Sequence, residues 1–154
     1  MPVIVVGADT EVGNAIVAAL EPGPREIRAF VSDPEAGARY KAIGAKTALG
    51  DVSDASHVGS AAIGAFSAIL VAEAASDGRE RSFAATADAV FETWAEALAE
   101  AEVSRTIWVG DVDPPDALAA SVPHLASVPV GDRSPAIVAQ EVAMLDDRSD
   151  WDAK

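Results

Sequence analysis

The sequence predicts an α/β fold in which a parallel sheet of five or six strands lies between two layers of helices. Three observations predict it. Short apolar runs alternate with helical periodicity along most of the 154 residues. The first run, residues 3–6, is rich in valine and isoleucine, as is typical of a parallel strand covered on both faces. A glycine turn then leads directly into a helix, and strands separated by helices in this way lie parallel.

The first turn carries the features of a dinucleotide-binding, Rossmann-like unit. Gly7 ends the strand, and Gly13 lies in the first helical turn, where a missing side chain lets the helix approach the sheet. The free N–H groups and the dipole of such a helix start favour an anion such as phosphate. The spacing departs from the usual pattern, because Thr10 stands in place of the middle glycine. Asp9 and Glu11 flank the turn, and we expect their carboxylates to repel phosphates.

The later elements follow from the same alternation. Pro34 occupies a first-turn position, and Gly44 closes the helix that Pro34 begins. An acidic segment, residues 51–54, caps the next helix. We expect further strands at residues 26–31, 46–49, 68–72 and 105–109, and helices at residues 34–43, 55–65, 81–101 and 135–145.

The helix over residues 81–101 carries a stripe of large apolar side chains. These recur at helical spacing and comprise Phe83, Val90, Phe91, Trp94 and Leu98. The stripe is expected to pack against the sheet. Part of the stripe is also a candidate interface with a second copy or a protein partner.

The chain is expected to form a single domain, residues 1–154. Residues 111–134 contain four prolines and predict a long loop with one helical turn near residues 116–120. Residues 146–154 are expected to form an acidic tail.

Composition limits the functions that this chain can have. The 25 acidic and 11 basic residues give a formal net charge of −14, which argues against binding nucleic acid or an anionic membrane through a basic surface. The sequence contains no cysteine, which excludes disulfides and thiolate chemistry. No apolar stretch reaches transmembrane length and the first residues enter a strand directly, so the expected location is cytoplasmic.

Several segments resemble the atypical short-chain dehydrogenase/reductase group, in particular its NmrA-like and biliverdin-reductase-like NAD(P)-binding members. The segments that carry the resemblance are residues 3–13, 30–45, 49–58, 68–75 and 105–110, the first reading VIVVGADTEVG. The resemblance covers roughly residues 2–151. It implies a Rossmann-like fold, a nicotinamide cofactor and oxidoreductase chemistry on a small molecule.

The resemblance also implies a set of cofactor-binding residues. The pyrophosphate is expected against Gly7, Thr10, Glu11, Val12 and Gly13. The residue matching Asp51 contacts the adenine amino group in this group of proteins, and Val52 lines the adenine pocket. Ala72 and Glu73 begin a loop that passes the ribose and pyrophosphate. Ser32 stands where NADPH-dependent members commonly have an arginine for the 2′-phosphate, so either NAD or NADP is expected, with NAD preferred.

The catalytic pair of many short-chain dehydrogenases, a tyrosine and a lysine four positions later, is absent. The single tyrosine, Tyr40, lies on the helix after the second strand, and Gly44 occupies the fourth position after it. Some atypical members transfer hydride without this pair, so the resemblance still implies an oxidoreductase. Relatives usually continue beyond Trp151 into a substrate-binding extension, so the substrate pocket is expected to be shallow or to be completed by a partner.

Two further functions are compatible with the sequence. One is a Rossmann-like accessory or regulatory binding protein without a cofactor. The other is a redox-independent lyase or isomerase, in which Asp111 or Glu73 pairs with His124 for acid–base work. Asp111, Asp113, Asp116 and His124 match no metal-binding loop, so we predict no metal site.

Overall fold

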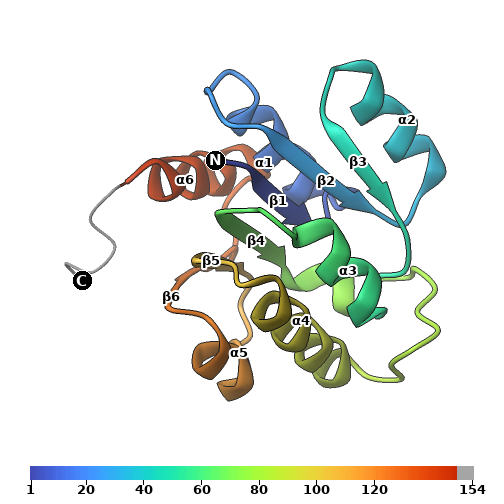
Figure 1. Cartoon of the computed structure of the whole chain (residues 1–154). Helices are drawn as coiled ribbons and strands as arrows, with labels where there is room; N and C mark the ends of the chain where they lie inside the picture. The colour runs from blue at the N-terminus through green and yellow to red at the C-terminus, as the bar shows by residue number, and fades with distance from the viewer. Residues whose placement is uncertain (149–154) are drawn as a thin grey trace.

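The computed structural model describes residues 1–148, which form a six-stranded, fully parallel sheet in the order β3-β2-β1-β4-β5-β6 (Figure 1). The strands are β1 (Val3–Val6), β2 (Ile27–Val31), β3 (Lys46–Leu49), β4 (Ser67–Val71), β5 (Arg105–Val109) and β6 (His124–Val128). The helices are α1 (Glu11–Leu20), α2 (Pro34–Ala42), α3 (Ala55–Ala62), the short 3-10 helix η1 (Ala72–Ala75), α4 (Ala87–Ala101), α5 (Asp116–Ser121) and α6 (Pro135–Asp147). The predicted fold class is therefore confirmed.

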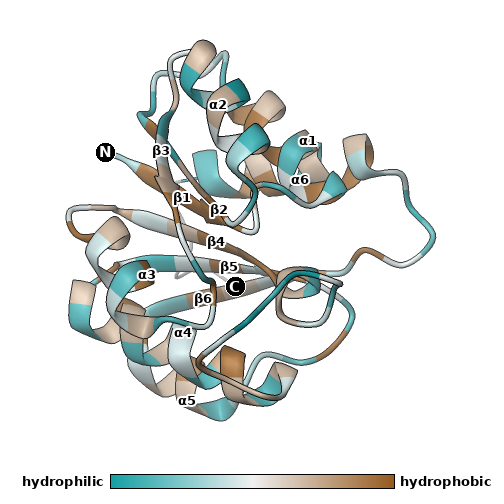
Figure 2. Cartoon of the chain, turned by 90° about the vertical axis from the view of Figure 1, so that its right-hand side faces the viewer, coloured by the Kyte–Doolittle hydropathy of each residue, from teal (hydrophilic) through white to brown (hydrophobic). Residues whose placement is uncertain are grey.

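The helices form one layer on each face of the sheet. Figures 1 and 2 show α1, α2 and α6 on one face and α3, α4 and α5 on the other. Successive strand residues point to opposite faces. Val3 and Val5 accordingly join the core beneath the first layer, whereas Ile4 and Val6 join the core beneath the second. All four side chains are fully buried. The uninterrupted apolar run of β1 follows from this double coverage.

The order of the strands reverses at β1. Val5 is in register with Ala29 of β2 on one side and with Ile69 of β4 on the other. Chain connections run outward in opposite directions from this point, which leaves a crevice at the carboxyl ends of the strands. Ligands of open α/β sheets bind in such a crevice.

The helical turn predicted near residues 116–120 is confirmed as α5, but the long loop predicted around it, over residues 111–134, is wrong, because the structure places the strand β6 within it. Pro115 is the N-cap of α5, and β6 lies between Pro123 and Pro129. β6 is an edge strand whose side chains alternate irregularly between buried and exposed. It therefore lacks the continuous apolar run that revealed the central strands.

The start of the fourth helix also differs from the prediction. Thr86 is the N-cap of α4, and its side chain accepts a hydrogen bond from the amide of Ala89. Phe83 precedes the helix and is 65% exposed, so it does not belong to the apolar stripe. The other four stripe residues, Val90, Phe91, Trp94 and Leu98, are buried within their own chain.

The acidic tail was predicted to start at Asp146, but this residue lies in α6 and is 1% exposed. Arg105 and Arg25 pair with its carboxylate. The remainder of the predicted tail, residues 149–154, lies outside the described residues. Within residues 1–148 no helix is both long and apolar enough to cross a membrane.

Candidate functional site

The turn between β1 and α1 is closed by hydrogen bonds of Thr10. Its hydroxyl oxygen lies 2.8 Å from the carbonyl oxygen of Gly7, to which it donates, and accepts a 2.9 Å bond from the amide of Gly13. Thr10 is thus the N-cap of α1, a role that favours threonine. A Cβ added at Gly13 would lie 2.0 Å from the carbonyl oxygen of Gly7, so only glycine fits there.

The same turn offers backbone donors to an anion. Glu11 and Val12 are the first two residues of α1, and amides at these positions have no intrahelical acceptor. Within residues 1–148, no protein oxygen accepts a hydrogen bond from either amide. The turn therefore keeps the anion-binding capacity that its sequence predicts, with a threonine cap in place of the middle glycine.

Asp9 does not direct its charge at these amides in the way we expected. Its carboxylate accepts hydrogen bonds from the amides of Ser32 and Asp33 at the start of α2, at 2.8 Å and 3.1 Å. Its other oxygen lies 2.8 Å from Nη1 of Arg79. With three donors bound and 6% of the side chain exposed, the carboxylate is held at the start of α2 and not on the amides of Glu11 and Val12.

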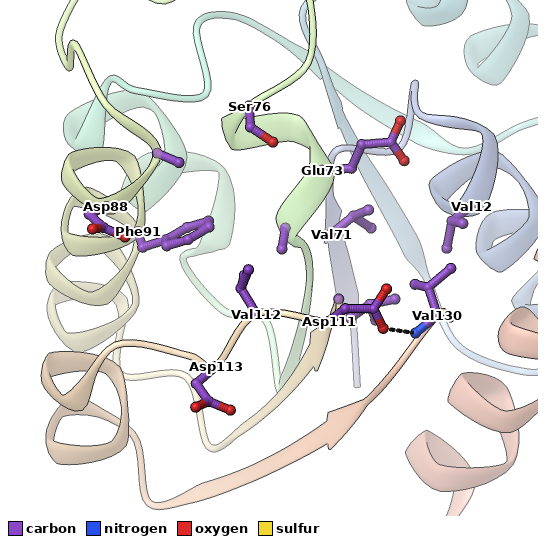
Figure 3. Close-up of a pocket in the computed structure, with 14 residues that line it drawn as sticks. Val12, Val71, Glu73, Ser76, Asp88, Phe91, Asp111, Val112, Asp113 and Val130 are labelled. Atoms are coloured by element: carbon purple, nitrogen blue, oxygen red, sulfur yellow. Dashed lines mark hydrogen bonds between the residues drawn. The ribbon is translucent and has the colours of Figure 1, made fainter. Parts of the chain in front are cut away.

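Two cavities open at the carboxyl edge of the sheet, one on each side of the glycine turn. Cavity A, of about 610 Å³, is lined by Asp9, Ser32, Asp33, Pro34, Gly50, Asp51, Arg79, Glu80 and Ser82. Cavity B, of about 460 Å³, is lined by Val12, Val71, Ala72, Glu73, Ser76, Ala87, Asp88, Phe91, Val109, Gly110, Asp111, Val112, Asp113 and Val130 (Figure 3). Asp9, at the start of the turn, lines cavity A, and Val12, on α1, lines cavity B. The turn with its free amides therefore connects the two cavities.

Asp51 borders cavity A, and protein donors already bind both of its oxygens. One oxygen accepts from the amide and hydroxyl of Ser53, at 2.8 Å and 2.6 Å, and the other from the amide of Ser82 at 2.7 Å. Burial opposes ionisation of Asp51, but these hydrogen bonds outweigh it, so the pKa of Asp51 lies below its ordinary value. The carboxylate is therefore charged at neutral pH and holds the segment around Ser82 against the end of β3.

Arg79 is the basic residue of cavity A. It forms a two-bond pair with Asp77, with Nε–Oδ1 and Nη2–Oδ2 distances of 2.8 Å each, in addition to its bond to Asp9. Burial disfavours the charged guanidinium, but the hydrogen bonds and charges of Asp77 and Asp9 outweigh it and raise the pKa of Arg79. Sequence reasoning missed this residue, because 70 positions separate Arg79 from Asp9 and no motif connects them.

Cavity B combines apolar walls with carboxylates. Figure 3 shows Phe91 and Val112 on one side and Val12 and Val71 on the other. The Phe91 ring packs edge-on against the buried Trp108, with ring centroids 4.7 Å apart. The lining also contains four acidic residues and no basic one; the acidic residues are Glu73, Asp88, Asp111 and Asp113.

The structure does not form either of the predicted acid–base pairs with His124. His124 begins β6 and is in register with Arg105, the first residue of β5. Asp111 lies two residues after the end of β5, and Glu73 lies in η1, which directly follows β4. His124 therefore lies at the amino-terminal edge of the sheet, whereas both carboxylates lie at the carboxyl-terminal edge, a strand length away.

Asp111 has a structural role in this arrangement. Its carboxylate accepts hydrogen bonds from the amides of Val130 and Gly131, which hold the connection after β6 across the sheet edge (Figure 3). In the described part of the chain, no group of three or more histidine and carboxylate side chains is arranged to hold a metal ion.

Val52 is fully buried in the core, and its carbonyl oxygen accepts from Nε1 of Trp94.

Comparison with known families agrees with this geometry. Residues 7–143 match the NAD(P)H-binding family. The chain belongs to this family. The match begins at Gly7 and includes every residue that lines the two cavities. A search of curated protein sequences gave no significant match.

Solved structures of reductases share the fold of this NAD(P)H-binding protein. Triphenylmethane reductase from Citrobacter sp. superimposes with a TM-score of 0.80 at 12% identity, over 98% of this chain and 67% of that one. An anaerobilin reductase from Escherichia coli O157:H7 gives a TM-score of 0.57 at 19% identity, over 94% and 66%. NADPH-dependent quinone oxidoreductase from Escherichia coli, solved with NADPH, gives 0.58 at 17%, over 94% and 44%. The chain thus spans from 44% to 67% of the length of these enzymes.

The residues present fit a dinucleotide. The two amides of Glu11 and Val12 suit a pyrophosphate, and a cavity lies on each side for the two nucleosides. Of the predicted cofactor residues, Ser32 and Asp51 line cavity A, and Val12, Ala72 and Glu73 line cavity B. Val52 lines neither cavity, since its side chain is directed into the core.

Proposed function

We propose that this NAD(P)H-binding protein is an atypical reductase that uses NADH in preference to NADPH and acts on a small molecule held in cavity B. The observation that supports this most strongly is the position of the glycine turn between two cavities. In this arrangement the adenosine lies in cavity A, the pyrophosphate lies on the amides of Glu11 and Val12, and the nicotinamide lies in cavity B. When bound, the reduced nicotinamide supplies a hydride.

The side chains of cavity B define the class of substrate. Phe91, Val71 and Val130 give it apolar walls against which an apolar molecule packs. Because its lining contains four carboxylates and no basic residue, a neutral or cationic apolar molecule fits and an anionic one is repelled. Structural neighbours named for triphenylmethane dyes and quinones make these two compound classes the first to test.

The proton that completes the reduction comes from solvent in this proposal. Tyr40 cannot supply it, since its ring is buried on α2 and its hydroxyl contacts the carbonyl oxygen of Ala8. No tyrosine, lysine or histidine lines cavity B. The residues of this chain therefore bind and orient the substrate and the cofactor, and no side chain is assigned as a general acid.

Titration of the full chain with NADH, NADPH, NAD⁺ and NADP⁺ by calorimetry tests the proposal. We expect micromolar binding of NADH, competition by ADP-ribose, and quenching of tryptophan emission, because Trp108 packs on a wall of cavity B. Asp51→Ala should weaken binding. Asp54→Ala, which removes the N-cap of α3 outside both cavities, is the matched control. Absence of binding of all four nucleotides up to millimolar concentration would overturn the proposal.

One observation favours a second candidate, an accessory protein without a cofactor. Asp51, the expected adenine ligand, already accepts from Ser53 and Ser82, and the segment leading to Phe83 is bound there by a further 3.0 Å bond from the amide of Phe83 to Ser53 Oγ. If the protein is such an accessory protein, residues 79–83 stay bound to Asp51 and Ser53 when nucleotide is added. Amide hydrogen exchange of residues 79–83, measured with and without NADH, separates the two candidates.

A further inference from the structure

The carboxylate of Asp9 occupies a ring of anion donors at the end of β2. Two successive amides, those of Ser32 and Asp33, reach one oxygen, and Arg79 reaches the other. The hydroxyl of Ser32 accepts from the same guanidinium nitrogen at 3.4 Å and donates to the carbonyl oxygen of Gly50 at 3.0 Å. The side chains of Asp9 and Arg79 are 6% and 10% exposed, so the donors are shielded from bulk water.

This donor set has the chemistry of a phosphate site. Adjacent backbone amides at a helix start and a guanidinium are groups that bind phosphate monoesters in proteins. Here the anion is the chain's own carboxylate. Three hydrogen bonds hold it, and a second, two-bond pair with Asp77 fixes the guanidinium of Arg79 in place.

The ring also forms part of the wall of cavity A. Asp9, Ser32, Asp33 and Arg79 all line the cavity. Asp51 and Glu80 complete its acidic lining, so that four carboxylates face a single arginine, which is itself paired twice. A dianion that entered this cavity would meet net negative charge and donors that are already bound.

We infer that Asp9 is the residue that excludes a 2′-phosphate and so sets the preference for NADH over NADPH. The inference rests on the proposed function, because it assigns cavity A to the adenosine. Asp9 acts in two ways: it saturates the donors that a phosphate needs, and it places a negative charge beside the position of the ribose. Removal of the Asp9 side chain leaves the amides of Ser32 and Asp33 and the guanidinium of Arg79 as a vacant phosphate site.

The test compares the affinities of Asp9→Ala and Asp9→Asn with that of the unaltered chain for NADH and NADPH. We expect the affinity ratio to shift toward NADPH by about tenfold or more in Asp9→Ala, and by less in Asp9→Asn, which retains an acceptor oxygen. Glu92→Gln is the control for overall charge, because Glu92 is exposed on α4 and lines neither cavity. An unchanged ratio in both Asp9 variants, with NADH still bound, would overturn the inference and leave the proposed function standing.

A second arm does not depend on nicotinamide. Binding of 2′,5′-ADP relative to 5′-ADP should rise in Asp9→Ala, and the gain should disappear in the double variant Asp9→Ala/Arg79→Ala. A gain that persists without Arg79 would reflect charge alone and would contradict the phosphate site. If no dinucleotide binds the unaltered chain, the proposed function fails, and this arm still decides whether Asp9 fills an anion site. Asp9→Asn and circular dichroism guard against a variant that does not fold.

Discussion

The hydroxyl of Tyr40 on α2 lies 2.6 Å from the carbonyl oxygen of Ala8 in the glycine turn. The same hydroxyl lies 2.8 Å from Oδ1 of Asn14 on α1. The single tyrosine of the chain therefore joins the turn to α1 and α2. Its role is to position the turn, which explains why a tyrosine occurs where short-chain dehydrogenase chemistry cannot use it.

Tyr40→Phe should lower the free energy of unfolding by about 1–2 kcal/mol, because it leaves a buried carbonyl oxygen without its donor. Burial raises the pKa of Tyr40 to about 12. Since this folded-state value lies above that of the unfolded chain, the stabilisation is complete below about pH 10 and is lost as the pH rises toward 12. Chemical denaturation at pH 8 and pH 11 measures both effects. An equal loss of stability at high pH in Tyr40→Phe would contradict this assignment.

Gly13→Ala should destabilise the protein by about 2–3 kcal/mol or more, because the new Cβ meets the backbone oxygen of Gly7, which cannot move aside as a flexible side chain could. Gly78→Ala is the matched control, since nothing lies within 4 Å of its added Cβ. Thermal unfolding of the two variants checks the prediction. Similar melting temperatures for both would mean that the turn is more adaptable than the structure shows.

Asp146→Ala should cost about 3–5 kcal/mol, because removing one partner of a buried ion pair leaves charge unpaired. Arg25 and Arg105 both pair with this carboxylate, at 3.3 Å and 3.2 Å, and both lie over the ring of Phe66. The neighbouring exposed residue provides the control, Asp147→Ala, which should change stability by less than about 0.5 kcal/mol. Urea denaturation distinguishes the two outcomes.

Phe91→Ala should destabilise the chain by about 3–5 kcal/mol, whereas Phe83→Ala should have an effect within about 0.5 kcal/mol. Phe91 is 5% exposed and packs on Trp94 and Trp108, but Phe83 is 65% exposed. A large loss of stability in Phe83→Ala would show that residue 83 is buried in solution, by the chain itself or by a second copy.

Acid should loosen the attachment of residues 77–82, which border cavity A. The pKa values of Asp51 and Asp77 are both lowered, because hydrogen bonds from Ser53 and Ser82 at Asp51, and from Arg79 at Asp77, outweigh the cost of burial. Carboxyls with lowered folded-state pKa values contribute stability above the unfolded value near pH 4, and this contribution is lost as the pH falls through the folded value. Asp51→Asn should therefore flatten the pH dependence of stability between about pH 5 and pH 2.

The sequence by itself determined the fold class and the glycine turn between β1 and α1. The apolar runs of β1, β4 and β5 identify strands buried on both faces, and the spacing from Gly7 to Gly13 identifies the dinucleotide-type turn. These signals are local, since a strand, a cap and a helix start depend on residues close together in the chain. β6 gave no such signal, because an edge strand is only partly buried and its pattern is mixed.

Only the tertiary structure decided which side chains meet. Asp9 and Arg79 are brought together by the crossover from β4, and Asp51 meets Ser82 across the same edge. His124 was separated from Asp111 by the direction of β6, which places its first residue at the far edge of the sheet. Contacts between distant segments depend on strand order and on the path of the connections. Neither can be predicted from the composition of the chain or from the spacing of its motifs. The residues of the turn could thus be predicted, whereas the charge balance that surrounds them required the folded chain.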